Sequence, residues 1–342
     1  MKYTIIIVTA TLQFACGARL MDYALSIANE DSEWDNFVRT SPQANVFSES
    51  GYLRALDVAF TRYLVRTPHG EIVAGTAILE QDAVMHAAPY PFTPYQGILF
   101  AQHIGQQPNH KRAVSEFRLS EFIINQLANR YGNFSMALSP EFTDLRPFAW
   151  HNYHAPDAPK FSIVPRYTAL LDLNGFDQQD YLTSIRAARR QEYKKAHAIV
   201  SETDAVDIFI ALYRQTFERQ QLAIDESAIN LVKRITTSAL TGGYGRLSQA
   251  TLADGQVASI NLFLFDRHRA YYLLAANAPA LRNSGASTQL MIDNIAHMAA
   301  RGLSDIDFVG VNSPNRGDFK LSFNPQLAPY HEVKLVAPAG QA

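Results

Sequence analysis

Apolar residues along this chain follow two different patterns, one typical of helices and one typical of strands. In some segments they recur every three or four positions, which is typical of a helix with one buried face, and in others they alternate or run together, which is typical of a strand. These patterns predict helices at residues 32–38, 51–59, 111–130, 178–196, 206–221 and 226–240, and a further one that begins near residue 284. They predict strands at residues 63–66, 72–79, 134–138, 167–173, 246–252, 257–265, 271–276 and 305–309.

The predicted elements occur twice in the same order. Each half of the chain reads helix, helix, hairpin, loop, helix and strand, and a proline-rich segment at residues 140–165 separates the halves. We therefore predict an α/β (α+β) protein of two tandem domains, each with a mixed, largely antiparallel sheet flanked by helices. The expected boundaries are residues 21–160 for the first domain and 161–338 for the second.

The composition fits this prediction. The 342 residues are enough for two domains, and the 47% hydrophobic and 18% charged residues are typical of a soluble protein with a packed core. A formal net charge of -2 argues against a protein that covers nucleic acid with a broad basic surface. The sequence has a single cysteine, Cys16, which excludes a disulfide within the chain.

The first twenty residues need a separate interpretation. Residues 1–20 hold a short apolar run that is interrupted by polar residues and preceded by a single lysine, which is a poor match to a signal peptide. We treat them as a doubtful N-terminal extension and expect a cytoplasmic protein. No stretch of the sequence is long and apolar enough to cross a bilayer.

One turn between a strand and a helix carries the first chemical signal. The strand at 271–276 leads into a turn made of Arg282, Asn283, Ser284, Gly285, Ala286 and Ser287. The first amides of a helix have no acceptor within it, and the helix dipole is positive there, so such a turn suits an anion. A phosphate-bearing ligand is the functional interpretation, and an ordinary connection between a strand and a helix is the alternative.

This turn and the elements around it resemble the GNAT acyltransferases. The pyrophosphate loop of that family has the form Gln/Arg-x-x-Gly-x-Gly/Ala, and Arg282-x-x-Gly285-x-Ser287 matches it with Ser in the last place. The resemblance implies an acyl-CoA or acetyl-CoA donor and two GNAT-like domains. It also implies that the donor is held by the turn, at Arg282, Ser284, Gly285, Ala286 and Ser287.

A narrower resemblance covers roughly residues 30–335. The tandem arrangement looks like the FemAB/FemX group, which forms peptidoglycan bridges. The sequence segments that carry this resemblance are Trp34 to Val38 with Asn45 to Phe47, Asp144 to Trp150, Tyr167 to Leu173, Arg186 to Ala196, and Phe319 to Phe323. The resemblance implies transfer to the amine of a small molecule or cell-envelope precursor held between the domains. It places Lys320 near the donor and Arg186 near the acceptor's phosphates.

Acyl transfer to an amine needs a held donor, a deprotonated amine and a stabilised oxyanion. Asp307 is the candidate base, because a carboxylate near the centre of a sheet is expected to have a raised pKa. An exposed carboxylate on that strand is the alternative. Asn277 is placed either to orient the donor amide or to cap its loop. Lys320 is either a catalytic donor contact or a solvent-facing charge in a loop.

The helix predicted at 178–196 carries a basic stripe. Arg186, Arg190 and Lys194 recur every four residues and so share one face of that helix. The stripe suits a polyanionic acceptor, and a solvated helix face is the alternative. Tyr95 lies in a Pro/Tyr-rich loop at 89–97, which is expected either to wall the acceptor pocket or to pack between the domains.

The sequence also limits the remaining chemistry. No histidine lies at a recognised metal spacing, so we expect no metal, and a P-loop, a serine elbow and a dinucleotide fingerprint are absent. Aminoacyl-tRNA is the rival donor, DNA is not expected as a partner, and a catalytically inactive binding protein is a further alternative. The first domain lacks a glycine turn before its helix at 111–130 and is expected to hold no donor.

Overall fold

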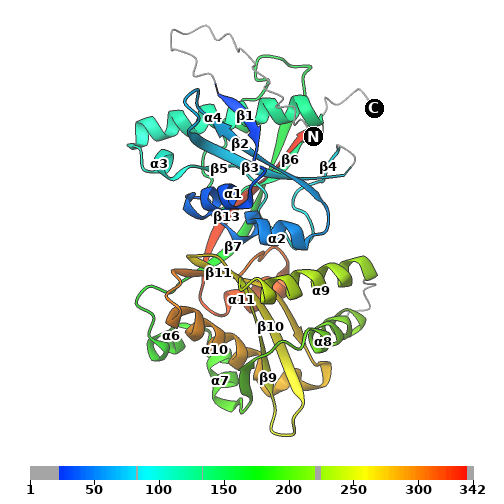
Figure 1. The fold of residues 1–342 in the computed structure, drawn as a ribbon. Helices are drawn as coiled ribbons and strands as arrows, with labels where there is room; N and C mark the ends of the chain where they lie inside the picture. Colours follow the sequence, from blue (N-terminus) through cyan, green and yellow to red (C-terminus); the bar gives the residue numbers. More distant parts are fainter. Residues whose placement is uncertain (1–22, 82–83, 133, 220–224, 337–342) are drawn as a thin grey trace. The chain divides into compact units, whose positions relative to one another are not determined.

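Figure 1 shows the computed structural model of the protein, which describes residues 23–81, 84–132, 134–219 and 225–336. The predicted N-terminal extension at residues 1–20 lies outside these residues. The chain divides into two compact units. Of the described residues, those in 23–50, 58–165 and 330–336 belong to unit 1, and those in 51–57 and 166–329 belong to unit 2.

Unit 1 holds a sheet with the strand order β1-β2-β3-β4, in which β5 also pairs with β3. The pairs β1–β2, β2–β3, β3–β4 and β3–β5 are antiparallel. The elements of the unit are β1 (Ala24–Ile27), α1 (Asp31–Thr40), η1 (Val46–Ser48), β2 (Ala59–Arg66), β3 (Ile72–Gln81), β4 (Val84–Met85), β5 (Leu99–Phe100), α3 (Gln102–Gly105), α4 (Asn109–Tyr131), β6 (Ser135–Ala137) and α5 (Arg146–Ala149).

The long helix α4 confirms the helix predicted at 111–130. Its residues Leu119, Ile123 and Leu127 recur every four positions, are buried, and share one core with Trp34 and Leu64. Residues at this spacing lie on one face of a helix, so a single stripe buries α4 against the rest of the unit. The core of unit 1 therefore follows directly from the periodicity of the sequence.

Unit 2 holds strands in the order β7-β12-β11-β10-β9-β8. β11 and β12 are parallel, and the other neighbours are antiparallel. Its elements are α2 (Ser50–Ala55), α6 (Gln178–Ser184), α7 (Ala187–Lys195), β8 (Ile199–Glu202), α8 (Val206–Arg219), α9 (Glu226–Thr241), β9 (Gly245–Thr251), β10 (Val257–Phe265), β11 (Arg269–Asn277), η2 (Pro279–Ser284), α10 (Ala286–Ala300), β12 (Asp305–Asp307) and α11 (Pro314–Leu321). Two further strands, β7 (Lys160–Asp172) and β13 (Gln326–Val336), pass from one unit into the other.

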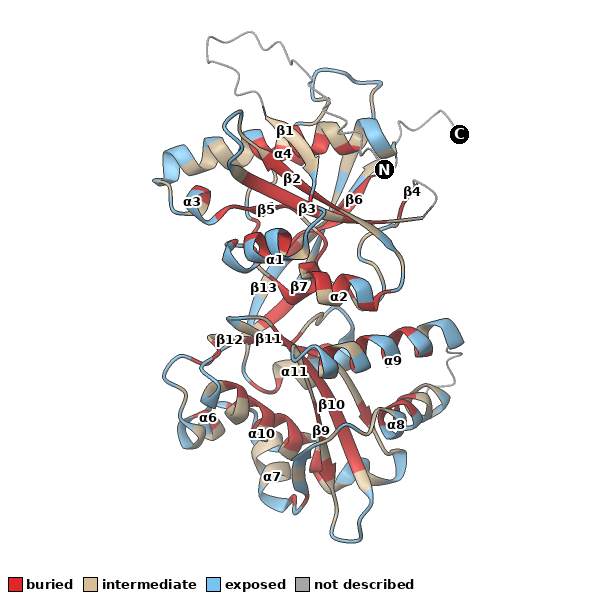
Figure 2. Cartoon of the chain, viewed as in Figure 1, coloured by how far each residue is buried: buried red, intermediate tan, exposed pale blue. Residues whose placement is uncertain are grey.

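Helices cover both faces of the unit 2 sheet. α10 contacts β9 and β10 on one face, and α8 and α9 contact β11 and β9 on the other (Figure 1). On the α10 face, Phe263 and Phe265 of β10 share a core with Met291 and Ile295 of α10. Figure 2 shows that β10 is buried along most of its length, as expected for a strand covered on both faces.

The β9–β10 hairpin confirms the hairpin predicted at 246–265. Its turn contains Asp254 and Gly255, and Gly255 has a φ of +84°, which glycine adopts without strain. The Leu252 N–H donates to the Gln256 carbonyl oxygen at 2.9 Å and closes the turn. Turn chemistry and alternating apolar residues agree here, so the local sequence is sufficient to predict the hairpin.

The single helix predicted at 178–196 is wrong, because the chain forms two helices there. α6 ends at Ser184 and α7 begins at Ala187, with Ile185 extended between them at a ψ of 163°. Ile185 is buried in the unit 2 core, and the following N–H, of Arg186, donates to the Ser322 carbonyl oxygen at 3.0 Å. Periodicity does not register a two-residue break when the segments on both sides remain helical.

The segment around Lys320 also differs from the prediction. We expected a loop, and the structure has the helix α11, which begins with Pro314 at its first position. Proline is favoured there because its missing N–H would have no acceptor in any case. The preceding strand β12 ends at Asp307 rather than at residue 309, since Val309 has a φ of +45° and leaves the strand.

Candidate functional site

The parallel strands β11 and β12 separate within the unit 2 sheet. They pair over three residues, and the last pair joins Tyr271 to Asp307. Beyond this pair, β11 continues along β10, whereas the chain after β12 remains with β7, where the Phe308 N–H donates to the Ala169 carbonyl oxygen at 2.9 Å. The sheet therefore opens at the carboxyl end of a parallel pair, which is the usual place for ligands in open α/β sheets.

A β-bulge in β11 lies at this opening. Leu262 of β10 pairs with Leu274, and the next pair joins Phe263 to Tyr272, so Leu273 has no partner residue on β10. The extra residue of a bulge stands outside the ladder of backbone hydrogen bonds. The bulge thus places the backbone of Leu273 directly beyond the last residue that β11 shares with β12.

The exposure of β11 agrees with this geometry. Residues 273–275 are partly exposed, whereas the neighbouring strand β10 is buried from Ala258 to Phe265. An interior strand with helices on both faces is normally buried along its length. We call residues 273–275 the β11 slot.

Lys320 of α11 reaches the point where the strands separate. Its ammonium group donates to the carbonyl oxygens of Val309 at 2.5 Å and Gly310 at 3.2 Å, just after β12. The same Nζ lies 5.5 Å from the centre of the Tyr272 ring on β11. A single cation thus lies between the segment that follows β12 and the Tyr272 ring of β11, next to the β11 slot, where it would stabilise a developing negative charge.

Burial lowers the pKa of the Lys320 ammonium from 10.5 to about 8. Loss of hydration disfavours the charged form, the carboxylate of Asp307 opposes this effect, and the cation of Arg316 adds to it. The alternative of a solvent-facing lysine in a loop is therefore wrong, because Lys320 is a partly buried helical residue. A lysine with a pKa near 8 changes charge close to neutral pH, which is typical of functional sites.

Asp307 is fully buried, so the alternative of an exposed carboxylate is wrong. Its Oδ1 accepts hydrogen bonds from the Val309 N–H at 2.7 Å and from the Thr168 hydroxyl. These bonds hold the turn whose carbonyl oxygens bind Lys320. Asp307 pairs with Tyr271 on the sheet face opposite Tyr272, and its role as a base stays a prediction.

The turn before α10 presents backbone amides. Gly285 has a φ of +77°, and α10 begins at the next residue. The Ala286 N–H donates to the Ser284 hydroxyl at 3.3 Å, whereas the N–H groups of Gly285 and Ser287 find no acceptor among the described residues. Arg282 is exposed in the same turn. Two amides without an acceptor, a helix N-terminus and an adjacent guanidinium together suit a phosphate group.

Helix α7 packs against this turn. A Cβ atom at Gly285 would lie 2.6 Å from the carbonyl oxygen of Glu192, so this position requires glycine for space as well as for its positive φ. The Glu192 carboxylate accepts from the hydroxyl of Thr288, in the first turn of α10, and pairs with Arg189 at 2.7 Å. Gly285 therefore has a packing function in unit 2, whatever binds at the turn.

Three side-chain polar atoms lie on the α10 face of β10 and β11 without a hydrogen-bond partner among the described residues. They are Ser259 Oγ, Asn261 Nδ2 and Asn277 Oδ1. Ser259 and Asn277 are directly paired across the two strands. An unpaired buried polar atom costs about 1–3 kcal/mol, so water or a ligand is expected to bind these groups. The carboxamide oxygen of Asn277 can accept a hydrogen bond from a bound donor, which is compatible with its predicted role.

The basic residues predicted to form a stripe mostly bind protein groups. Arg186 precedes the first turn of α7, and its guanidinium donates to both carboxylate oxygens of Asp318, at 2.9 and 2.8 Å. Arg190 donates to two backbone carbonyl oxygens at the end of α6. Lys194 is exposed. The predicted stripe is wrong for Arg186, because that residue lies outside the helix.

Tyr95 lies in the core of unit 1. Its side chain is 1% exposed, and its ring packs against Phe47 and Tyr330 at centroid distances of 6.0 and 5.5 Å. A buried ring does not wall an open pocket in this conformation. The contact between Tyr95 and an acceptor stays a prediction.

Two further features of the described residues bear on ligands and location. In that part of the chain, no three histidine, cysteine, aspartate or glutamate side chains come together as a metal-ion site would need. None of the helices in the described ranges combines the length and the apolar character that a membrane crossing requires.

Sequence reasoning missed two features of this site. The Leu273 bulge has no residue signature, because the strands on both sides of it read as ordinary strands. Arg189 links three helices: it donates to the Thr288 hydroxyl at 3.1 Å, pairs with Glu192, and lies 5.3 Å from the centre of the Phe319 ring. Its position beside Arg190 in the sequence was a signal only for surface charge.

Comparison with known proteins finds a likeness for the part of the chain that contains this geometry. Residues 179–321 match the model of the GNAT acetyltransferase domain. The match includes the β11 slot, the turn before α10 and Lys320. A search of the curated proteins finds no match to this sequence.

Solved structures extend the likeness to both units. The structure of FemX is 13% identical, with 91% of this chain and 97% of that chain covered and a TM-score of 0.64. A tandem GNAT protein from the clavulanic acid biosynthesis pathway is 12% identical, covers 94% and 100%, and has a TM-score of 0.52. The structure of L-PGS from Bacillus licheniformis is 10% identical, covers 91% and 93%, and has a TM-score of 0.50. These likenesses show the fold and confirm two GNAT-like domains of mixed α/β architecture.

Proposed function

We propose that this protein is an N-acyltransferase in which unit 2 moves an acyl group from acyl-CoA to an amine, with acetyl-CoA as the simplest donor. The observation that carries the proposal is the separation of β11 and β12 with the Lys320 ammonium at the point of separation. The match of residues 179–321 to an acetyltransferase domain supports the same reaction type.

The donor extends along β11 in this proposal. Its pyrophosphate binds the free N–H groups of Gly285 and Ser287 beside Arg282, at the positive end of α10. Its thioester lies in the β11 slot, and Asn277 accepts a hydrogen bond from an amide of the donor's arm. The support for this direction is that the turn follows the carboxyl end of β11 directly in the chain.

The chemistry is a direct attack. The amine nitrogen forms a bond to the thioester carbonyl carbon and the carbon–sulfur bond breaks. The nitrogen loses a proton and the departing thiolate takes one up, so that the products are an amide and a free thiol. Negative charge on the carbonyl oxygen is stabilised by the Leu273 N–H and by the Lys320 ammonium. Lys320 acts in its charged form here, since its protons are donated to carbonyl oxygens, and Asp307 positions it through the turn at Val309.

Unit 1 has no comparable donor site in this proposal. Its strand β5, before α3 and α4, is only two residues long, and α3 lies between β5 and α4. A Cβ atom at Gly105, the last residue of α3, would lie 2.4 Å from a side-chain atom of Pro42, so the end of α3 is closely packed. We assign unit 1 to the binding of the acceptor, which is the amine of a small molecule or a cell-envelope precursor.

Release of free CoA from acetyl-CoA in the presence of a panel of primary amines tests the proposal. We expect amine-dependent release of the thiol, and a loss of about 100-fold or more in kcat/KM for Lys320→Met, as for the removal of one oxyanion-stabilising group. Lys194→Met is the matched control, because Lys194 is an exposed lysine on α7. Absence of both thiol release and binding heat with millimolar acetyl-CoA would sink the proposal.

The same preparation tests the rival donor. Binding of aminoacyl-tRNA through phosphate contacts falls steeply between about 50 and 200 mM salt. Arg186 and Arg190 bind a carboxylate and backbone carbonyl oxygens of the protein, so we expect no such binding. Tight, salt-dependent binding of tRNA without turnover of acetyl-CoA would favour the rival.

A further inference from the structure

Helix α7 contacts both of the segments that hold the donor in the proposed reaction. On one side, the carbonyl oxygen of Glu192 is packed against Gly285 in the turn before α10. On the other side, the residue before α7 is bound to the end of α11, because the Arg186 N–H donates to the Ser322 carbonyl oxygen. Every residue from Ala187 to Lys195 is described, and none of them is buried. α7 is therefore held by specific contacts rather than by a buried apolar face.

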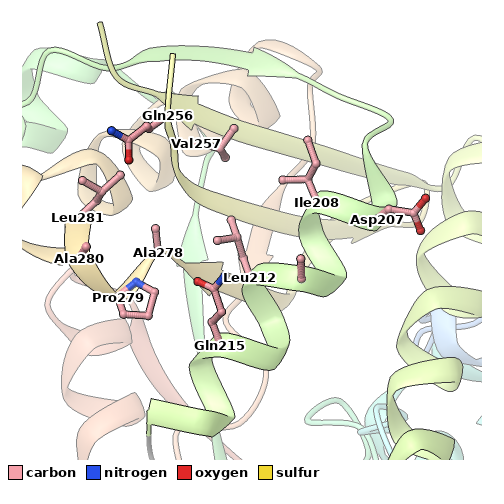
Figure 3. Close-up of a pocket in the computed structure, with 11 residues that line it drawn as sticks. Asp207, Ile208, Leu212, Gln215, Gln256, Val257, Ala278, Pro279, Ala280 and Leu281 are labelled. Carbon is pink, nitrogen blue, oxygen red and sulfur yellow. The ribbon is translucent and has the colours of Figure 1, made fainter. Parts of the chain in front are cut away.

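Helix α8 gives the segment before this turn little support. Residues 278–281, which lead into the turn, line a pocket of about 650 Å³ whose other wall is α8. Figure 3 shows Leu212 and Gln215 of α8 facing Ala278 and Pro279 across this space. Since the pocket separates α8 from this segment, the contacts with α7 become important for the position of the turn.

Arg189 joins α7 to the first turn of α10. Its guanidinium donates to the Thr288 hydroxyl at 3.1 Å. Thr288 is fully buried and follows Gly285 by three positions. Its hydroxyl donates in turn to the Glu192 carboxylate, which also pairs with Arg189 at 2.7 Å. These three side chains form a closed set of polar contacts at the end of α10 that carries the anion-binding turn.

The same guanidinium contacts α11. It lies 5.3 Å from the centre of the ring of Phe319, the residue before Lys320. A guanidinium over an aromatic ring is attracted by the negative face of the ring. The Phe319 ring also packs against Phe323, and Phe323 packs against Phe308, which follows β12. Arg189 is thus linked to the turn on one side and to the segment around Lys320 on the other.

The charge of Arg189 is balanced within the protein. The Glu192 carboxylate pairs with it, and the Arg189 side chain is only 19% exposed. A paired and largely covered cation adds little to the attraction of a ligand. The shape of the group matters more, because a planar guanidinium with donors at fixed angles reaches Thr288 and Glu192 while it lies over the Phe319 ring.

We propose that Arg189 is a positioning residue for the acyl donor, an inference that rests on the proposed function. It holds the turn before α10 and helix α11 at a fixed separation. A donor whose phosphates are bound at the turn then brings its thioester carbonyl to Lys320. Arg189 touches neither end of the donor in this role and acts through Thr288 and Phe319. A misplacement of about 1 Å at the reacting group can lower a rate about 100-fold, so such a link has a measurable effect.

Two thioesters distinguish this role from a general loss of structure. Acetyl-CoA is held at the turn and in the β11 slot, whereas acetyl-pantetheine lacks the phosphates and is held in the slot alone. Arg189→Met should lower kcat for acetyl-CoA about tenfold or more with little change in KM, because the phosphates still bind while the carbonyl is misplaced. For acetyl-pantetheine, kcat should stay within about threefold of the wild type, because Lys320 remains bonded to Val309 and Gly310.

Arg189→Lys separates the geometry of this residue from its charge. Lysine keeps the positive charge but lacks the planar group that reaches Thr288 and lies over Phe319, so we expect it to behave like Arg189→Met. Phe319→Leu breaks the same link from α11 and should show the same difference between the two thioesters. The double variant Arg189→Met with Phe319→Leu should lose no more than either single variant, since both remove one link.

Arg214→Met is the matched control. Arg214 also joins two helices of unit 2, because it pairs from α8 with Glu226 at the start of α9, at 2.6 Å. We expect this variant to turn over both thioesters at wild-type rates. Thermal unfolding checks that each variant is folded, and Phe319→Leu tests the link if Arg189→Met does not fold.

The outcomes separate this inference from the proposed function. Turnover of both thioesters that Arg189→Met lowers equally, or full recovery of kcat in Arg189→Lys, would overturn the positioning role and leave the proposed function intact. Absence of turnover of both thioesters by the wild type would overturn the proposed function and the role of Arg189 with it.

Discussion

Lys320 is expected to destabilise the folded protein at neutral pH, and its replacement by methionine makes this measurable. The ammonium group is partly buried beside Tyr272, and burial lowers its pKa to about 8. In the unfolded chain the pKa of a lysine is 10.5. The folded state therefore holds the proton of Lys320 less tightly than the unfolded state does.

The sign of the pH dependence follows from this difference. Below pH 8 both states are protonated, and the full destabilisation is present. Between pH 8 and 10.5 the unfolded state binds more protons than the folded state, so the free energy of unfolding rises with pH. Above pH 10.5 both states are neutral and the destabilisation has gone.

The magnitude follows from the size of the pKa shift. A decrease from 10.5 to about 8 corresponds to about 3 kcal/mol in total, of which about 2 kcal/mol is regained between pH 7 and pH 10. Methionine has a similar length and no titratable group. The difference in the free energy of unfolding, wild type minus Lys320→Met, should therefore increase by about 2 kcal/mol over this interval.

Urea unfolding followed by far-ultraviolet circular dichroism at pH 7, 8, 9 and 10 measures this difference. The loss of the two hydrogen bonds to Val309 and Gly310 adds a term that is nearly independent of pH, so the slope rather than the absolute value tests the argument. Lys194→Met, at an exposed position, should give a difference that stays flat within about 0.5 kcal/mol. A flat or falling difference for Lys320→Met would refute the burial of a charged ammonium at this place.

Three other outcomes test the site. In Lys320→Arg the cation keeps its charge at high pH, so the fall in kcat/KM that we expect near pH 8 for the wild type should disappear from a pH–rate profile. Gly285→Ala should destabilise by about 2 kcal/mol or more in thermal unfolding, because strain at φ +77° adds to a clash with α7. Gly302 has a φ of +79° and open space around it, so Gly302→Ala should lose only the stability that backbone strain costs. Equal losses of stability in the two variants would contradict the packing argument. Asp318→Asn frees Arg186 and should strengthen binding of polyanionic ligands in a filter assay, with little change in Tm.

The types of most elements were predictable from the sequence because they depend on neighbouring residues. The apolar stripe of α10 repeats every three or four residues within one short segment. The Asp254-Gly255 turn between β9 and β10 likewise depends only on residues next to each other in the sequence. Helical period, strand alternation and turn chemistry agree in these segments, so no distant contact was needed to choose between helix and strand.

The break at Ile185 was not predictable in the same way. Both flanking segments keep a helical pattern, and the decision between one helix and two depends on the burial of Ile185 and on the bond from the next N–H to Ser322. That partner lies far along the chain. The prediction that Arg186 belongs to the basic stripe was wrong for the same reason, because it assumed a continuous helix through that residue.

The candidate site also has some features that the sequence predicted and others that only the structure showed. By itself the sequence determined the turn before α10, whose Gly285 and small neighbours are contiguous, and it pointed to Lys320 through a resemblance. Only the tertiary structure decided that Lys320 is buried between two separating strands, that Leu273 forms a bulge, and that Asp307 bonds to Thr168, 139 positions away. The burial of a side chain, its pKa and the register of a strand depend on residues that come into contact only after folding. A pattern of neighbouring residues therefore does not predict them.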